Sequence, residues 1–125
     1  MAKPVFINTL VFVSDMKRSV DFYCHRLGQT VAQDHGDFVQ LENGLALHRG
    51  PALEATMFGA PSGERSPYGR GNLVLYFETD ELEAMFARMP LKTDLIHPIE
   101  TQAWGQKVFR CYDPDGHIVE VGEPM

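Results

Sequence analysis

A single carboxylate interrupts an apolar run near the end of the chain. The segment Asp113–His117 contains Asp, Pro and Gly, the residue types that tight turns favour, and the run Ile118–Val121 that follows predicts a strand around Glu120. A carboxylate in a buried strand is costly unless it is paired. We therefore expect Glu120 to face a wet cavity, a cation or a metal; the alternative is an edge strand on which Glu120 faces solvent.

A second polar residue occupies the matching place in the first half of the chain. His48 follows Gly44 by four residues, as Glu120 follows Gly116 by four. If the two side chains face each other across one cavity, the carboxylate orients the imidazole and favours its protonated form, which makes His48 and Glu120 a catalytic acid and base. The alternative is a polar lining that only hydrogen-bonds a ligand or water.

Hydrophobic periodicity predicts the elements that position these residues. Each half begins with an apolar strand, continues with an amphipathic helix and ends with three further strands. Strands are expected at residues 5–13, 29–33, 37–41, 45–49, 73–77, 95–101, 107–112 and 117–123. Helices are expected to begin after Ser14 or Asp15 and after Thr79 or Asp80, and to end at Gly28 and Pro90.

The repeated order indicates an internal duplication of about 60 to 65 residues. Repeat 1 covers about residues 5–49 and repeat 2 about residues 71–123, within a single domain of residues 1–125. Residues 50–70, rich in Gly and Pro, form the linker between them, with one short helical turn near residues 53–58.

Asn8 and Asn72 each open one of the predicted buried strands. An unpaired amide is expensive there, so each side chain either donates to a ligand or ties down neighbouring backbone.

Aromatic residues provide candidate walls for a ligand cavity. Trp104, the only Trp, either forms an aromatic wall for a planar or apolar ligand or packs at the rim of the domain. Phe12, Tyr76 and Phe109 could complete an apolar cavity, although ordinary core packing is the alternative for Phe109. Arg110 interrupts an apolar strand and needs a carboxylate partner, for which we expect an internal Asp or Glu rather than a ligand acid.

The chain resembles the vicinal oxygen chelate superfamily, which includes glyoxalase I, bleomycin-resistance proteins, extradiol dioxygenases and fosfomycin-resistance enzymes. Besides the duplicated order, the residues that carry the resemblance are Leu10–Asp15, Arg18-Ser19, Phe22-Tyr23, Leu27-Gly28 and Asp113–His117 with Glu120. The resemblance implies an α+β fold. Two tandem βαβββ modules would form a cupped, partly open mixed β-sheet barrel with flanking helices, usually in a homodimer.

The resemblance also implies where a metal would bind. The positions that hold ligands in metal-dependent members are here Asn8, His48, Asn72 and Glu120. Asn binds Zn²⁺, Ni²⁺ or Fe²⁺ much less well than His, and His48 with Glu120 makes two good ligands where catalytic sites usually have three. We therefore expect no cofactor; a divalent metal, if one binds, would use His48 and Glu120.

The composition argues against two classes of binding partner, nucleic acids and membranes. A net charge of −6 argues against binding to nucleic acid, and no apolar run approaches the roughly 20 residues of a membrane-spanning helix. The start of the sequence lacks the apolar segment of a secretory signal, which favours a cytoplasmic location. Cys24 and Cys111 have no CxxC spacing and are expected to be reduced packing thiols.

Together these features predict a glyoxalase/bleomycin-resistance-like protein that binds a small organic molecule in the sheet cavity without a transition metal, for sequestration or for metal-independent chemistry. The residues expected to contact the ligand are Asn8, Phe12, Asn72, Tyr76, Trp104 and Phe109, beside His48 and Glu120. One alternative is a divalent-metal-dependent lyase or isomerase of the glyoxalase type that uses His48 and Glu120. A non-catalytic interaction domain is the other.

Overall fold

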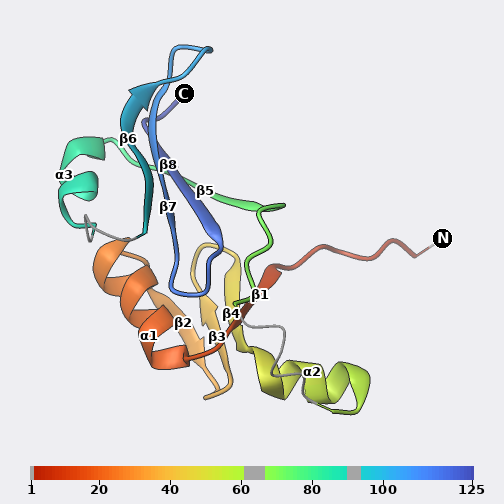
Figure 1. Ribbon diagram of the computed structural model, residues 1–125. Coiled ribbons are helices and arrows are strands. Elements are labelled where there is room, and N and C mark those ends of the chain that lie inside the picture. The colour runs from red at the N-terminus through yellow and green to blue at the C-terminus, as the bar shows by residue number, and fades with distance from the viewer. Residues whose placement is uncertain (1, 61–66, 90–93) are drawn as a thin grey trace.

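The computed structural model describes residues 2–60, 67–89 and 94–125, which form an α+β fold of two modules (Figure 1). The first module contains β1 (Thr9–Val13), α1 (Met16–Val20), a π-helix (Asp21–Arg26), β2 (Val31–Asp34), β3 (Phe38–Leu41) and β4 (Leu45–Arg49). After α2 (Gly50–Phe58), the second contains β5 (Val74–Glu78), α3 (Leu82–Ala87), β6 (Leu95–Thr101), β7 (Lys107–Tyr112) and β8 (Ile118–Gly122). Both modules have the predicted βαβββ order.

Each module has one four-stranded mixed sheet, and the two sheets have the same topology. The strand orders are β1-β4-β3-β2 and β5-β8-β7-β6. The opening strand runs parallel to the closing strand, and the other neighbours are antiparallel. Within the described residues the sheets stay open and do not close into a barrel. The expected α+β fold of paired modules is confirmed.

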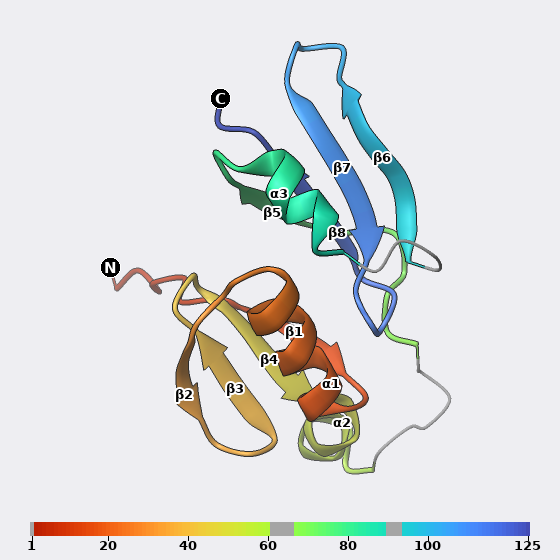
Figure 2. The ribbon, with the colours of Figure 1, turned by 90° about the vertical axis from the view of Figure 1, so that its left-hand side faces the viewer.

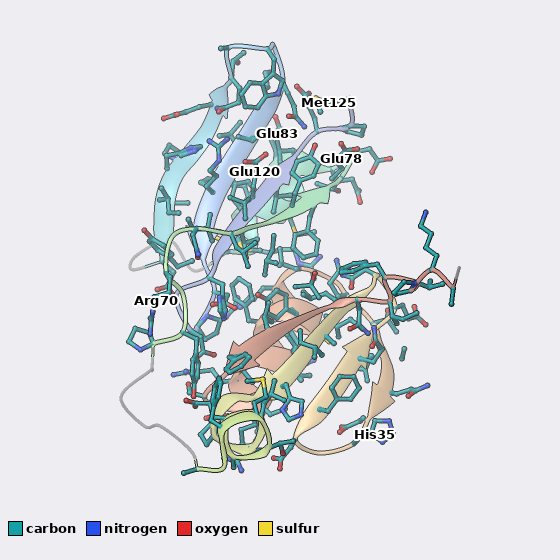
Figure 3. All side chains as sticks on the ribbon, turned by 90° about the vertical axis from the view of Figure 1, so that its right-hand side faces the viewer. His35, Arg70, Glu78, Glu83, Glu120 and Met125 are labelled. Atoms are coloured by element: carbon teal, nitrogen blue, oxygen red, sulfur yellow. The ribbon has the colours of Figure 1, made fainter. Side chains whose placement is uncertain are left out.

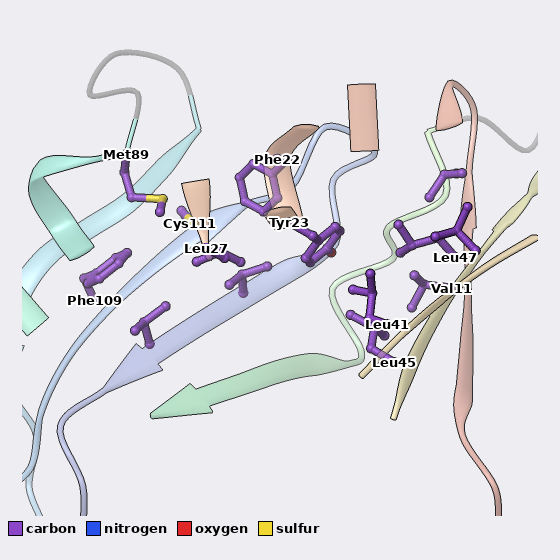
Figure 4. Close-up of a cluster of buried hydrophobic side chains, with 14 of the residues drawn as sticks. Val11, Phe22, Tyr23, Leu27, Leu41, Leu45, Leu47, Met89, Phe109 and Cys111 are labelled. Atoms are coloured by element: carbon purple, nitrogen blue, oxygen red, sulfur yellow. The ribbon is translucent and has the colours of Figure 1, made fainter. Parts of the chain in front are cut away.

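The helices α1 and α3 and the hydrophobic core lie on one side of the sheets. Figure 2 shows α1 over the first sheet and α3 beside the second, both toward the viewer. One hydrophobic cluster (Figure 4) fills the space beneath them and joins the modules, with Val11 and Leu47 from the first sheet and Phe109 and Val119 from the second. The opposite side of both sheets is not covered by α1 or α3, and of the described helices only α2 lies toward it, at the end of β4 (Figure 3). We call this side the open face.

Alternation along the strands decides which side chains reach the open face. In β1, Val11 and Val13 are buried in the core, while Leu10 and Phe12 point the other way. Successive side chains of a strand alternate between its faces, so Leu10 and Phe12 share the face opposite the core.

The first strand is shorter than predicted. Residues 5–8 do not belong to β1, and Val5, Phe6 and Ile7 are 78%, 82% and 75% exposed on a segment that extends away from the molecule (Figure 1). The ladder with β4 begins at the pair Thr9↔Leu45. Because β4 itself starts at Leu45, the residues before Thr9 have no neighbouring strand with which to pair.

The segment predicted as a linker contains more structure than expected. The short helical turn expected near residues 53–58 is a nine-residue helix, α2, which ends at Gly59 in the left-handed region with φ of 86°. Pro51 lies in its first turn, where the missing N–H costs nothing. Residues 61–66 of the predicted linker lie outside the described residues.

The predicted helix ends are partly confirmed. Asp15 caps α1 by accepting a hydrogen bond from the Arg18 backbone N–H, and Gly28 has a φ of 67°. The second helix begins later than predicted, after Glu81, while Thr79 Oγ1 accepts from the Glu81 N–H. Pro90, the predicted end of that helix, lies outside the described residues.

In the part of the chain that the structure describes, every helix is too short or too polar to cross a membrane.

Candidate functional site

On the open face of the first sheet, one row of neighbouring residues crosses three strands. Phe12 of β1 is paired with His48 of β4, and His48 is paired with Phe38 of β3. The imidazole lies 5.9 Å from the Phe38 ring, and its Nδ1 lies 3.1 Å from the Arg49 carbonyl oxygen, which only accepts, so Nδ1 carries the proton. With the proton on Nδ1, the tautomer that carries no second proton has Nε2 as an acceptor.

The second sheet has the equivalent row, which crosses all four strands. Tyr76 is paired with Glu120, Glu120 with Arg110, and Arg110 with His97. Tyr76 and Glu120 thus occupy the same places in the second sheet as Phe12 and His48 in the first, which agrees with the repeat alignment made from the sequence. Figure 3 looks onto the open face and shows Glu120 on β8.

Glu120 is paired with a cation from its own sheet. Nε of Arg110 donates to Glu120 Oε1 at 2.7 Å, and the two side chains are 24% and 13% exposed. The internal salt bridge predicted for Arg110 is confirmed. Of the surroundings expected for Glu120, namely a wet cavity, a cation or a metal, the structure has the cation, and the carboxylate charge is balanced within the protein.

His48 and Glu120 are not joined by a hydrogen bond or an ion pair in the described residues. The contacts of His48 lie within the first sheet and those of Glu120 within the second. Each side chain instead forms the centre of its own row on the open face. A direct acid–base pair of the kind that the sequence suggested is not formed in the single chain.

Two residues predicted to contact the ligand, Trp104 and Tyr76, are linked through Gln106 in the second module. Trp104, 58% exposed in the turn between β6 and β7, donates through Nε1 to Gln106 Oε1 at 2.8 Å. The Gln106 amide donates to the Tyr76 hydroxyl oxygen at 2.8 Å, and Tyr76 in turn donates to Glu78. The buried Gln106 side chain is therefore hydrogen-bonded to both aromatic residues.

The asparagines differ from their predicted roles. Asn8 precedes β1, and its amide donates to Gln40 Oε1 at 2.6 Å, so it ties the N-terminal segment to β3. Asn72 is exposed and lies two residues before β5 rather than at its start. The prediction that both open buried strands is wrong, because both strands begin later than the apolar pattern suggested.

Phe109 lies on the other side of the second sheet. It is 0% exposed, belongs to the core cluster and packs edge-on against Phe86 of α3 with ring centroids 5.2 Å apart. Its neighbour Arg110 occupies the open face, and alternation therefore directs Phe109 inward. The prediction that Phe109 contacts a ligand is corrected to a role in the core.

The structure gives a physical test of the metal that the superfamily implies. The Glu120 carboxylate has a guanidinium nitrogen 2.7 Å away, and a divalent cation there would be repelled by that fixed charge. The Asn8 side chain is hydrogen-bonded to Gln40, and Asn72 precedes β5. Among the described residues, no three His, Cys, Asp or Glu side chains gather as a metal site. This donor set does not suit a transition metal.

A pocket of about 260 Å³ lies beside the free edge of β1. Phe12 lines it together with Leu73 and with residues that the sequence analysis placed in the linker or the turn, namely Tyr68, Arg70 and His117. The Tyr68 ring lies 5.4 Å from that of Phe12, and its hydroxyl donates to the buried Glu54 at 3.0 Å. Desolvation and the hydrogen bond to Glu54 raise the pKa of Tyr68 to about 12, so the phenol stays protonated.

The turn before β8 is bound to the first module, which positions this pocket. His117 Nε2 donates to the Phe12 carbonyl oxygen at 2.8 Å, although the two residues are 105 positions apart. Asp115 accepts from the backbone N–H and hydroxyl of Ser14, at 3.0 and 2.6 Å. Asp113 accepts from the hydroxyl of the buried Tyr23 at 2.6 Å. The polar turn that stood out in the sequence is therefore a junction between the modules.

Burial makes the contribution of Asp113 to the stability of the fold depend on pH. The pKa of this carboxyl is raised above its usual 3.8, chiefly by desolvation, although the hydrogen bond from Tyr23 opposes the shift. The folded state therefore binds this proton more tightly than the unfolded state does. The contribution of Asp113 to stability must fall as the pH rises from about 3.8 through the higher pKa of the folded state, and stay constant above it.

We expect this dependence to appear as a difference between the wild type and Asp113→Asn, which has no titrating group at this site. The unfolding free energy of the wild type minus that of the variant should be larger at pH 4 than at pH 7. Urea denaturation at both pH values measures it. A difference that grew with pH would mean that the native state favours the ionised carboxylate.

Comparison with known proteins places the chain in a family. Residues 6–125 match the family model of the glyoxalase-like domain, and the chain therefore belongs to that family and to the vicinal oxygen chelate superfamily. Comparison with curated proteins gives no significant match.

Among solved structures, a protein of unknown function from Agrobacterium tumefaciens str. C58 is 46% identical, with a TM-score of 0.92 over 100% of this chain and 98% of the other. A glyoxalase/bleomycin resistance protein/dioxygenase from Nocardioides is 22% identical, with a TM-score of 0.72 over 98% and 85%. A lactoylglutathione lyase from Agrobacterium tumefaciens is 21% identical, with a TM-score of 0.67 over 98% and 95%. The last two likenesses concern the fold alone.

Proposed function

We propose that this protein binds a small organic molecule on the open face of its sheets and that binding needs no transition metal. The observation that carries the proposal is the Arg110–Glu120 pair: a cation of the protein itself occupies the place beside the carboxylate where a metal would have to bind. The apolar part of the ligand would lie against exposed aromatic side chains, and polar groups of both rows would fix its orientation.

Exposed apolar residues on the open face support a binding role. Leu10, Val74 and Tyr76 are 43%, 48% and 44% exposed, on the two strands that begin the modules. Exposed patches of this kind mark places where a ligand or a partner binds. We propose that the protein is a homodimer in which part of this face is covered and the remainder lines the ligand site.

The experiment is a thermal-shift screen of small organic molecules in the presence of EDTA. A molecule that binds only the native state raises the free energy of unfolding by mass action, and so raises the melting temperature. At a free concentration of 100 Kd the free energy of unfolding rises by about 2.7 kcal/mol. At least one compound should stabilise the wild type, and less so after Phe12→Ala or His48→Ala.

Lys17→Ala is the matched control, because Lys17 is exposed on α1, on the helix side of the sheets. It should respond to the compound as the wild type does. If no compound stabilises the protein with EDTA present, the proposal fails.

A further inference from the structure

We infer that Arg110 is the anchor of the ligand site and that its guanidinium binds a carboxylate group of the ligand, in the place where a metal would otherwise meet the ligand's oxygens. The inference rests on the proposed function, because it concerns the chemistry of a molecule bound on the same open face. It names a ligand class: a small, planar or apolar organic acid.

The guanidinium is held from three directions. Nε donates to Glu120 of β8 at 2.7 Å, and Nη1 donates to Gln102 Oε1, in the turn after β6, at 3.0 Å. Nη1 also lies 2.9 Å from His97 Nε2 of β6. A cation fixed by two strands and a turn is preorganised, so little conformational entropy is lost when it binds a further group.

Only one of these three partners carries a charge that offsets the guanidinium. His97 Nδ1 lies 2.7 Å from the Pro98 carbonyl oxygen, which only accepts, so the ring proton is on Nδ1 and Nε2 accepts from Arg110. His97 in this state and Gln102 are neutral. Nη2 has no acceptor among the described residues, and its two N–H groups remain for a ligand oxygen.

The cation is specific to the second module. In the first sheet the residue paired with His48 is Phe38, whereas in the second the residue paired with Glu120 is Arg110. The two rows are otherwise alike in position. In the first row His48 lies between two aromatic residues, whereas in the second row Glu120 lies between Tyr76 and the cation Arg110.

The surroundings of Arg110 favour an acid with a flat apolar body. Gln102, which holds Arg110, belongs to the same turn as Trp104, and the Gln106 amide links Trp104 to Tyr76. An aromatic ring can stack on these exposed side chains while its carboxylate reaches Arg110. Arg is also the cation best suited to carboxylates, since its planar N–H groups can bond both oxygens.

Benzoate and benzamide test the inference, because they have the same ring and nearly the same shape but only benzoate carries a charge. Titration calorimetry gives the affinity, and fluorescence of Trp104, the only Trp in the chain, reports whether the probe binds nearby. Both probes are titrated in EDTA into the wild type, Arg110→Gln and the double variant Arg110→Gln, Glu120→Gln. The double variant leaves no carboxylate without its partner. Lys107→Gln, which removes an exposed cation from the same strand, is the control.

Benzoate should bind the wild type and Lys107→Gln alike, with a change in Trp104 fluorescence, and benzamide should bind at least about tenfold more weakly. Both Arg110 variants should lose at least about tenfold in benzoate affinity. Equal binding of the two probes, equal binding by the variants, or no binding of benzoate overturns the inference. The proposed function is judged separately: if neutral molecules stabilise the protein in the EDTA screen while benzoate does not bind, the proposed function stands and the inference alone fails.

Discussion

Replacing Phe109 with alanine is expected to lower the free energy of unfolding by about 4 kcal/mol, which corresponds to a fall in melting temperature of roughly 15 °C. Phe109 is 0% exposed and packs on Phe86 with ring centroids 5.2 Å apart. The variant loses the burial of a whole ring and leaves a cavity between β7 and α3. Urea or thermal denaturation measures the loss.

Trp104→Ala is the matched control, because it also removes an aromatic ring but at a side chain that is 58% exposed. Its expected cost is about 1 kcal/mol or less. Phe109→Leu, which keeps most of the volume, should leave ligand affinity unchanged. If Phe109→Ala were no more destabilising than Trp104→Ala, the core role of Phe109 would be wrong.

The second large effect is expected at the junction between the modules. Asp115→Ala should cost about 3 kcal/mol of unfolding free energy. Asp115 is 1% exposed and accepts from the Ser14 N–H, the Ser14 hydroxyl and the hydroxyl of the buried Ser19. Its removal leaves donors without an acceptor in a place that water barely reaches, and each such donor costs about 1 kcal/mol or more. Arg18, half exposed and 3.8 Å away, contributes little because water screens the pair.

Asp34→Ala is the control for this measurement. Asp34 accepts one bond, from the Gly36 N–H, in an exposed turn, so its loss should cost less than about 1 kcal/mol. Denaturation of both variants by urea gives the comparison. Similar losses for the two would show that Asp115 does not join the modules.

Periodicity made much of the fold predictable. Strands at 45–49, 95–101 and 107–112 have the predicted bounds, because each is a short segment that contains several apolar residues. The repeat alignment placed His48 and Glu120 at equivalent positions, and the sheet registers Phe12↔His48 and Tyr76↔Glu120 agree with it. Strand bounds and the alignment of the two repeats can be predicted because they depend on residues that are close together in the sequence.

What the sequence did not reveal depends on partners that are distant along the chain. An apolar run from Val5 predicts a strand, but whether it forms one depends on where β4 begins. Phe109 looked like a cavity residue because apolar residues are alike in a core and in a pocket, and only the position of Arg110 on the open face assigns the two sides. His117 gave no sign that it binds Phe12, 105 residues away.

The candidate site changes accordingly. The sequence suggested one pair, His48 with Glu120, whereas the structure has two rows in which each of them has its own neighbours. Arg110, treated in the sequence as a residue in need of a partner, becomes the group that decides the character of the second row. A strand pattern shows that an Arg is buried among apolar residues, but the identity of its partner depends on the sheet register.

The most direct test of the account is the affinity of a stabilising compound, measured by titration calorimetry in EDTA and again with one equivalent of Ni²⁺ or Zn²⁺. With the guanidinium of Arg110 already beside the Glu120 carboxylate, the compound should bind with the same Kd under both conditions. Binding that disappears in EDTA and returns with the metal would contradict the account, and most clearly so if Glu120→Gln then abolished the effect of the metal.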